Sequence, residues 1–309
     1  MMNMYKKNLT ILIFAVGVFV LACDRFEGGQ TVPAYLDIDS VEVVDNVNDS
    51  RNQPSGFFTS KIDCVEVTIY FDGDASETTL GVFELPCHIP VLREGVISRL
   101  RVSPVVKQNG IAATHIYYPY YSNMEFDSMY TLVRNETTSM GKLTTTYKKN
   151  AYVAWSEFFE PGTQRLALDS IVKRVDYHNE GYADTVLSDD GCGVIHIGGR
   201  SVQLDFWSLD TIDLRHFSSD SYLYLELDYW NDLPFSVGFK NPMISGGQDV
   251  TERAMIINPH KGWNKIYVNL GRLWNYYNHY PVIRLHFSVL TGTGNTGNIY
   301  LDNMKLMVI

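Results

Sequence analysis

The chain has 309 residues, of which 13% are aromatic and only 19% are charged, with a formal net charge of −10. This length suffices for two domains, and the abundant tyrosine and phenylalanine are typical of all-β exported proteins rather than helical bundles or disordered stalks. An acidic surface repels phosphate backbones, which argues against nucleic acid as a partner.

A predicted export signal occupies residues 1–22. Lys6 and Lys7 precede an uncharged, mostly apolar run over residues 9–22, which is too short to cross a bilayer as a helix of about 20 residues. The run ends in Val20-Leu21-Ala22-Cys23, which resembles the lipobox of bacterial lipoproteins, although Leu21 is bulkier than the residue usual at its place.

The resemblance implies that Cys23 is the site of lipid attachment and becomes the first mature residue. Several acyl chains then anchor the protein stably to a membrane of the bacterial cell envelope. We expect the outer membrane, and whether the protein faces the periplasm or the cell surface is left open. The alternative is an ordinary signal peptide in which the Cys23 thiol is incidental.

Residues 23–33 contain two glycines and a proline without an apolar pattern, and are predicted to be a tether. Alternating apolar and polar residues then predict about seven short strands, the clearest at 64–71, and a register change near Ser40. Asn109-Gly110 is a strong hairpin signal between strands at 99–105 and 111–118. Residues 34–147 are therefore predicted to form an immunoglobulin-like β-sandwich.

Four tyrosines surround Pro119 in this first sandwich. As a strand, the segment would place Tyr118 and Tyr120 on one face and Tyr117 and Tyr121 on the other. One interpretation is a buried aromatic row, and the alternative is an exposed patch that binds a partner protein.

Further strands are predicted at 152–161, 202–206, 222–229, 235–239, 255–257, 265–270, 283–289 and 299–307, with one short helix at 270–278. In the strand at 222–229, Leu223, Leu225 and Leu227 should face the core, while Glu226 and Asp228 should face outward.

A resemblance covers residues 148–309. Phe159-Glu160, the Gly-Trp-Asn-Lys-Ile-Tyr run at 262–267 and the final strand at 299–306 resemble jelly-roll, galactose-binding-like domains that serve as carbohydrate-binding modules. The expected fold class is all-β, with the immunoglobulin-like β-sandwich followed by a C-terminal β-jelly roll. The whole layout is similar to surface lipoproteins of Bacteroides-like bacteria.

The resemblance also implies one structural calcium between the first and last strands of the jelly roll. The matching positions are Glu160, with Glu157 as a further candidate, and Asp302. Calcium takes six to eight oxygen ligands, so backbone carbonyls would supply the rest. The alternative is that these acids are solvated residues at strand ends.

Catalytic motifs are absent from the sequence, so we expect a protein that is not an enzyme. The alternative is a glycosidase, because the 35 acidic residues supply many carboxylate pairs that the sequence cannot place relative to one another. Cys64 and Cys87 stand at strand ends where they could pair, whereas Cys192 has no evident partner. A disulfide framework is therefore not expected to stabilise the fold.

Aromatic side chains near strand ends are the candidate ligand-binding residues, since they can stack on sugar rings. Trp263, Trp274 and Tyr277 are instead expected to pack in the core. The candidates are Trp207, Trp230, Tyr276 and Tyr280.

Two functions of different class follow. The first is a surface lipoprotein that binds a neutral glycan through its jelly roll. The second is a non-catalytic assembly subunit that docks on other envelope proteins. A rimmed site with an exposed aromatic row favours the first, and a flat apolar patch favours the second.

Overall fold

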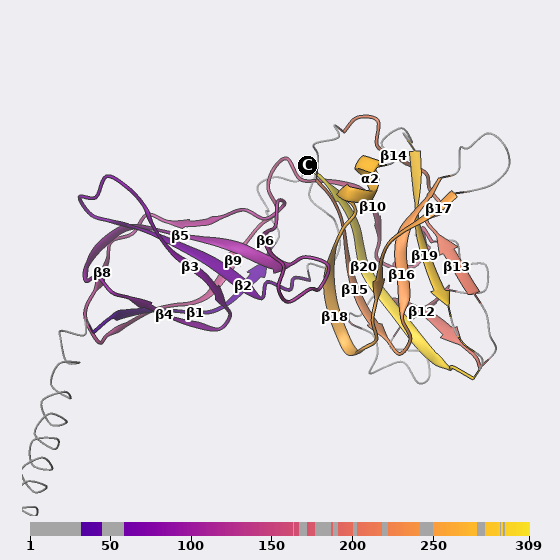
Figure 1. The fold of residues 1–309 in the computed structure, drawn as a ribbon, viewed down its shortest axis with the longest axis horizontal. Helices are drawn as coiled ribbons and strands as arrows, with labels where there is room; N and C mark the ends of the chain where they lie inside the picture. Colours follow the sequence, from indigo (N-terminus) through magenta and orange to yellow (C-terminus); the bar gives the residue numbers. More distant parts are fainter. Residues whose placement is uncertain are drawn as a thin grey trace, which may run out of the picture.

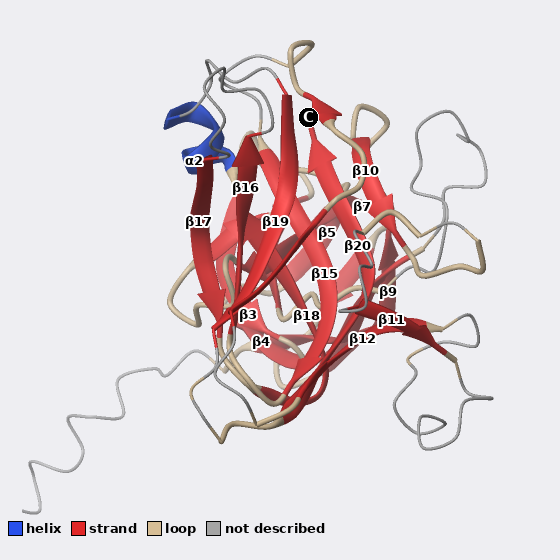
Figure 2. Cartoon of the chain, turned by 90° about the vertical axis from the view of Figure 1, so that its right-hand side faces the viewer, coloured by secondary structure: helices blue, strands red, loops and turns tan. Residues whose placement is uncertain are grey.

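The computed structural model describes residues 32–44, 59–162, 164–166, 172–176, 187, 191–199, 203–217, 222–241, 250–276, 282–290, 292 and 294–309. This part of the chain consists of strands with one short helix, α2 (Gly271–Tyr276), which confirms the predicted all-β fold class (Figure 2). The export signal, Cys23 and most of the tether lie outside the described residues. None of the described helical segments is long and apolar enough to span a membrane.

The N-terminal sandwich comprises two sheets built from β1 to β9 (Figure 1). In one sheet, β1 (Ala34–Val43) pairs with β4 (Cys87–Val91) and, in parallel, with β9 (Thr137–Thr145). The other sheet runs from β3 (Thr78–Glu84) through β2 (Cys64–Phe71) to the long β5 (Gly95–Lys107). The free edge of β5 carries three short strands, which are β8 (Tyr130–Leu132), β7 (Met124–Phe126) and β6 (His115–Tyr117).

Local sequence patterns account for much of this sandwich. Strand β2 has its predicted bounds, and the β1–β9 pairing shifts register between Ile38 and Ser40, where the apolar alternation changes phase. Asn109 and Gly110 both have positive φ, as the hairpin signal requires. However, the strand after this turn begins at His115 rather than Ile111, because residues 108–114 form a longer loop closed by a hydrogen bond from Gln108 N to Thr114 O.

The C-terminal sandwich comprises the sheets formed by β10 to β20. In its six-stranded sheet, β20 (Gly297–Val308) pairs on one side with β15 (Leu223–Asn231), and β15 pairs with β18 (His260–Asn269). The other side of β20 pairs with β12 (Cys192–Ile197) and β10 (Tyr152–Glu157), and β11 (Val172–Val175) joins β12. The five-stranded sheet has the order β13 (Gln203–Trp207), β19 (Val282–Leu290), β16 (Phe235–Asn241) and β17 (Val250–Ile257), with β14 (Ile212–Asp213) also paired to β19.

A hydrophobic core lies between these two sheets. As predicted, Leu223, Leu225 and Leu227 of β15 are completely buried in it. Phe206 of β13 stacks on Phe287 of β19, with ring centroids 5.0 Å apart. This contact adds to the pairing of β13 with β19 within the five-stranded sheet. Strands β7, β11, β12 and β14 were not predicted, since short strands contain too few alternating residues to be recognised.

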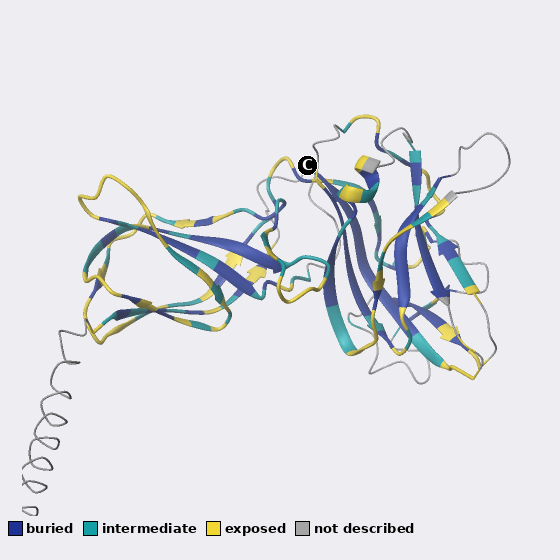
Figure 3. Ribbon diagram, in the orientation of Figure 1, coloured by how far each residue is buried: buried dark blue, intermediate teal, exposed yellow. Residues whose placement is uncertain are grey.

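The two sandwiches share a buried junction, where one end of the N-terminal sandwich lies against the outer face of the six-stranded sheet (Figures 1 and 3). The N-terminal core continues into this face through Tyr224, Tyr267 and Met307. The loop after β5 contributes backbone contacts, since Asn109 N donates to Tyr267 O at 2.9 Å and Asn269 N donates to Asn109 Oδ1 at 2.8 Å. The loop therefore covers the C-terminal end of the edge strand β18, at Tyr267 and Asn269.

Tyrosines of the N-terminal sandwich form the centre of this junction. Tyr118, Tyr120 and Tyr121 are buried, whereas Tyr117 is 56% exposed. The alternation predicted for this segment is wrong, because the strand ends at Tyr117 and a turn follows, with Tyr121 N donating to Tyr118 O. The aromatic patch thus packs against the C-terminal sandwich of the same chain. It is not an exposed surface for another protein.

The buried carboxylate of Glu226 accepts hydrogen bonds from the tyrosine hydroxyls. Tyr118 donates to Glu226 Oε1 and Tyr147 donates to Oε2, each at 2.8 Å, and Lys265 Nζ lies 3.3 Å from Oε2. Burial, reinforced by the Glu226 charge, raises the pKa of Tyr118 and Tyr147 well above the ordinary value, so both phenols remain donors. Glu226 and Asp228 were expected to face solvent. They do project from the outer face of the sheet, but the N-terminal sandwich covers that face.

We predict that Tyr118→Phe lowers the free energy of unfolding by about 1.5–3 kcal/mol, because it removes a hydrogen bond to a buried charge. The matched control is Tyr117→Phe, which removes a hydroxyl that donates to Glu66 at an exposed site; because water screens and replaces an exposed contact of this kind, the change should stay within about 1 kcal/mol of the parent. Urea denaturation measures both. Equal effects of the two substitutions would show that the junction contributes no more than a surface contact.

Candidate functional site

The five-stranded sheet lies on the side of the C-terminal sandwich away from the junction (Figure 1). A groove is formed on its outer face. Successive residues of a strand face opposite sides, so each strand that buries apolar side chains in the core presents the intervening polar ones here. The groove has a volume of about 470 Å³, within the range of small-molecule sites. It is lined by Gln203, Asp205, Trp207, Ser236, Lys240, Thr251, Glu252, Arg253, His286 and Ser288.

Strand register explains why this face is hollow. One row across the sheet runs from Trp207 through His286 and Gly238 to Arg253. Strand β17 approaches so closely that a Cβ on Gly238 would lie 1.8 Å from the Glu252 carbonyl oxygen, so only glycine fits there. The neighbouring row contains Ser288 and Ser236, which are small. Apart from His286, the centre of the face therefore carries only glycine and serine, while larger side chains stand at its sides.

Trp207 stands on β13 at one side of the groove and is half-buried. The Lys240 ammonium lies 3.9 Å from the centroid of its ring, a cation–π contact that holds the indole in place. The groove thus contains a fixed aromatic surface beside charged and hydroxyl groups.

Asp205 of β13 lines the groove between Gln203 and Trp207. Its Oδ2 accepts a hydrogen bond from Gln203 Nε2 at 2.9 Å, and its Oδ1 lies 3.2 Å from His286 Nε2. The latter contact is poorly aligned for a hydrogen bond, so the buried Oδ1 keeps acceptor capacity beyond its contact with His286. Buried polar atoms are nearly always hydrogen-bonded, so this oxygen is suited to accept a hydrogen bond from a ligand hydroxyl.

His286 lies at the centre of the groove and is 8% exposed. Burial is the main cause that lowers its pKa below the ordinary value, and the positive charges of Lys240 and Arg253 act in the same direction. The Asp205 carboxylate opposes this shift without reversing it. The imidazole is therefore neutral at pH 7, with one donor and one acceptor nitrogen.

The predicted aromatic candidates do not form one site. Trp207 lines the groove, but Trp230 projects from β15 on the other sheet, where its ring lies 5.3 Å from that of Tyr300. Trp263, expected in the core, is only half-buried beside the same tyrosine, whereas Trp274 is buried as expected. Tyr277, Tyr280 and the side chain of Tyr276 lie outside the described residues.

The acids implied in calcium binding are engaged with the protein itself. Glu157 is buried and accepts hydrogen bonds from the backbone amides of Phe159 and Arg165. Asp302 is buried and its Oδ1 accepts from Asn303 N at 2.7 Å, while Glu160 is half-buried. Among the described residues these three carboxylates do not form a compact ligand set. The Phe159 carbonyl accepts a hydrogen bond from Arg174 Nε, so a guanidinium already supplies positive charge there. Calcium binding stays a prediction.

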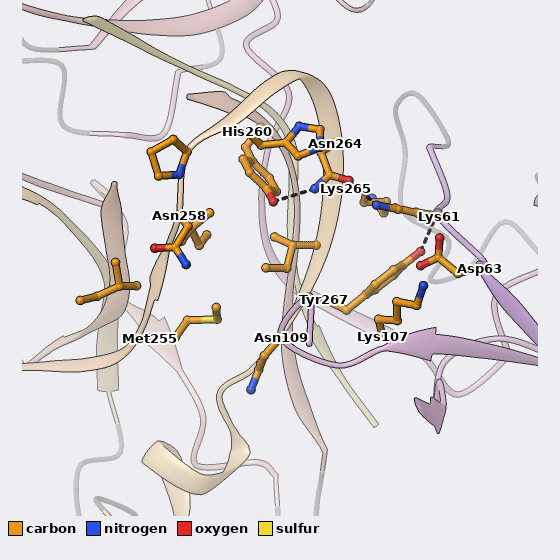
Figure 4. Close-up of a pocket in the computed structure, with 16 residues that line it drawn as sticks. Lys61, Asp63, Lys107, Asn109, Met255, Asn258, His260, Asn264, Lys265 and Tyr267 are labelled. Carbon is orange, nitrogen blue, oxygen red and sulfur yellow. Dashed lines mark hydrogen bonds between the residues drawn. The ribbon is translucent and has the colours of Figure 1, made fainter. Parts of the chain in front are cut away.

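A second hollow, of about 360 Å³, lies at the junction of the two sandwiches (Figure 4). Its polar groups bind one another: Lys61 Nζ donates to Asn264 Oδ1 at 2.6 Å, and Asn264 Nδ2 donates to the Tyr229 hydroxyl at 2.7 Å. Lys61 N donates to the Tyr267 hydroxyl. Because these donors and acceptors are satisfied, we assign them to the junction and regard the groove as the candidate ligand site.

Asp205 and His286 were not identified from the sequence as candidate site residues, although the strands that carry them show a recognisable pattern. Residues 203–207 and 284–288 both alternate polar and apolar side chains, and the polar positions other than Arg284 line the groove. The pattern identifies outward residues, but it does not show that Asp205 and His286 lie opposite Ser288 and Trp207 in adjacent strands.

No protein-family model matches the chain, and no curated protein matches it. Solved structures similar to it include a family 11 carbohydrate-binding module from Clostridium thermocellum in complex with a β-1,3-1,4-mixed-linked tetrasaccharide, at 12% identity and TM-score 0.35, covering 49% of this chain and 93% of that one. A family 30 module of a cellulosomal cellulase from the same organism has 16% identity and TM-score 0.33, covering 50% and 91%. A carbohydrate-binding module of the β-sandwich superfamily has 11% identity and TM-score 0.33, covering 78% and 84%. We therefore infer function from the groove itself.

The lowered pKa of His286 makes stability depend on pH. Between that lowered pKa and about 6.5, the unfolded chain binds a proton that the folded protein does not, so stability falls as pH decreases through this window. We predict that His286→Gln removes this loss of stability. The loss it removes amounts to about 1.4 kcal/mol for each unit by which folding depresses the pKa of His286. Thermal denaturation from pH 7 downward measures it. The control His216→Gln changes an exposed histidine and should leave the slope in place; an unchanged slope in His286→Gln contradicts the assignment.

Proposed function

We propose that this protein is a non-catalytic, lipid-anchored surface protein that binds a neutral glycan in the groove of its C-terminal sandwich. The observation that carries the proposal is Asp205 Oδ1, a buried oxygen two residues from Trp207 on the same strand, whose contact with His286 Nε2 at 3.2 Å is poorly aligned and leaves acceptor capacity for a ligand. An aromatic surface next to an incompletely satisfied acceptor suits a sugar ring, which has apolar C–H patches and hydroxyl donors.

The other groove residues extend this match. Trp207 offers an apolar surface, and Ser236, Ser288 and neutral His286 offer hydrogen bonds to hydroxyl groups. Lys240 and Arg253 are balanced in the lining by Asp205 and Glu252, so the groove has no strong preference for a charged ligand. A small ligand that meets one aromatic ring and a few polar groups binds with an affinity of roughly micromolar to millimolar.

The alternative function is an assembly subunit that docks on envelope proteins, and an exposed tyrosine patch would have favoured it. Tyr118, Tyr120 and Tyr121 are buried against the C-terminal sandwich of the same chain. Their apolar surface is therefore used within the molecule. The groove, which combines convergent polar groups with an aromatic ring, is typical of a small-ligand site instead.

Membrane attachment through Cys23 remains part of the proposal and is supported by the sequence alone. The chain after Cys23 enters the N-terminal sandwich first, and the groove lies on the face of the C-terminal sandwich that points away from it (Figure 1). Anchored in this way to the outer membrane, the N-terminal sandwich would act as a spacer that presents the groove to a glycan.

We predict that the purified protein binds a neutral oligosaccharide on a glycan array, and that Trp207→Ala weakens binding of that oligosaccharide at least about 10-fold, or 1.4 kcal/mol. The physical reason is loss of the stacking surface. Isothermal titration calorimetry gives the affinities, and Asp205→Asn tests the acceptor in the same assay.

The matched control is Trp230→Ala, the same change at a half-buried tryptophan on the opposite sheet, which should leave the affinity unchanged. Melting temperatures of all variants exclude unfolding as the cause. Loss of binding in Trp230→Ala with full binding in Trp207→Ala would place the site on the other sheet, and a protein that binds no glycan would refute the proposal.

For the anchor, we predict that cells expressing the full chain incorporate labelled fatty acid into it and that Cys23→Ala abolishes both labelling and partition with membranes. Fractionation followed by immunoblotting measures the partition. Cys87→Ala, which removes a half-buried thiol of the N-terminal sandwich, should retain both properties. A Cys23→Ala protein that still partitions with membranes contradicts lipid attachment.

A further inference from the structure

A cluster of three different metal-ligating side chains lies on the N-terminal sandwich, far along the chain from the groove. The Cys64 thiol, a Glu84 carboxylate oxygen and a His115 ring nitrogen all lie within 4.8 Å of one another. The three cysteines of the described chain are free thiols, so Cys64 is not consumed by a disulfide with Cys87.

Strand register places these side chains on one face of the sheet. Cys64 of β2 lies directly opposite Glu84 of β3 and, on its other side, opposite Val105 of β5. His115 of β6 lies opposite Lys107, two residues beyond Val105 and thus on the same face. Paired strands hold all three positions, which is more rigid than a set of ligands on loops.

The surroundings of the thiol contain both a cation and further acid. The Glu84 and Asp63 carboxylates and the Lys107 ammonium all lie close enough to the Cys64 thiol to interact with it electrostatically. Lys107 Nζ lies 3.3 Å from Glu84 Oε1. Lys107 and Asp63 also line the junction hollow, where Figure 4 shows their side chains next to each other. In the metal-free protein, therefore, the Lys107 ammonium supplies the positive charge at this cluster.

We propose that Cys64, Glu84 and His115 form a zinc site in which Zn²⁺ replaces the ammonium of Lys107. Zinc takes thiolate, imidazole and carboxylate ligands in a tetrahedral arrangement, and three protein ligands leave the fourth position to water. On binding, the Cys64 thiol releases its proton to solvent, the Lys107–Glu84 ion pair breaks, and bonds from sulfur, nitrogen and oxygen to the metal form.

Exposure of the ligands favours this assignment. Glu84 and His115 are exposed, so an ion can reach them from solvent, whereas Cys64 lies buried beneath them. The Lys107 side chain is 26% exposed and flexible, so it can swing aside when a metal enters. Asp63 adds a second carboxylate close to the thiol, which offsets the charge of a divalent cation.

Cobalt is the probe for the thiolate ligand, because Co²⁺ bound to a thiolate gives a near-ultraviolet charge-transfer band. We expect the fully reduced full-length protein to show this band on titration with Co²⁺, and Zn²⁺ to abolish it by displacement. Cys64→Ser should remove the band, and His115→Ala should weaken Zn²⁺ binding at least about 10-fold.

Two further variants distinguish this site from adventitious binding. Cys87→Ser removes the other thiol of the same sandwich and should leave the band and the affinity unchanged. Lys107→Met removes the cation that competes for Glu84 and should tighten Zn²⁺ binding, which neither a misfolded protein nor an unrelated site would show. The absence of a band, its persistence in Cys64→Ser, its loss in Cys87→Ser, or weaker binding in Lys107→Met would each overturn the proposal.

Discussion

The arrangement of the two sandwiches depends on one buried charge, the carboxylate of Glu226. Its two oxygens accept hydrogen bonds from Tyr118 and Tyr147 of the N-terminal sandwich, and Lys265 of β18 balances its charge. A buried carboxylate costs several kcal/mol in lost hydration unless charged and hydrogen-bonding groups surround it. Separation of the sandwiches would break both tyrosine hydrogen bonds to Glu226. The Glu226 carboxylate would then keep Lys265 but lose these two donors.

This junction decides which surface of the C-terminal sandwich is open to a ligand. Both of its sheets carry polar and aromatic residues on their outer faces, because strand alternation requires it. The N-terminal sandwich covers part of the six-stranded sheet, and Tyr224, Tyr267 and Met307 join the N-terminal core. The five-stranded sheet lies on the other side of the C-terminal sandwich, and its outer face carries the groove. Its hollow shape follows from Gly238, where the approach of β17 excludes any side chain.

Sequence patterns predicted the sandwiches well, since the alternation of apolar and polar residues is a local property that survives in the folded chain. They predicted β2 at its bounds and the inward leucines of β15. They failed for the tyrosine segment, where a turn at Pro119 replaces the expected strand, and for short strands such as β11 and β14. The groove was predicted only through Trp207, because Asp205 and His286 become neighbours through strand pairing.

The sequence by itself determined which side chains of each strand face the core and which face outward, and it provides the whole case for the lipid anchor at Cys23. It could not distinguish one outward polar residue from another. Glu226 and Asp205 occupy equivalent places in alternating strands, yet Glu226 is covered by a second sandwich and Asp205 lines an open groove. Only the tertiary structure decided between these two outcomes, because the covering residues come from a part of the chain about 80 to 110 positions away, and strand alternation carries no information about contacts at that distance.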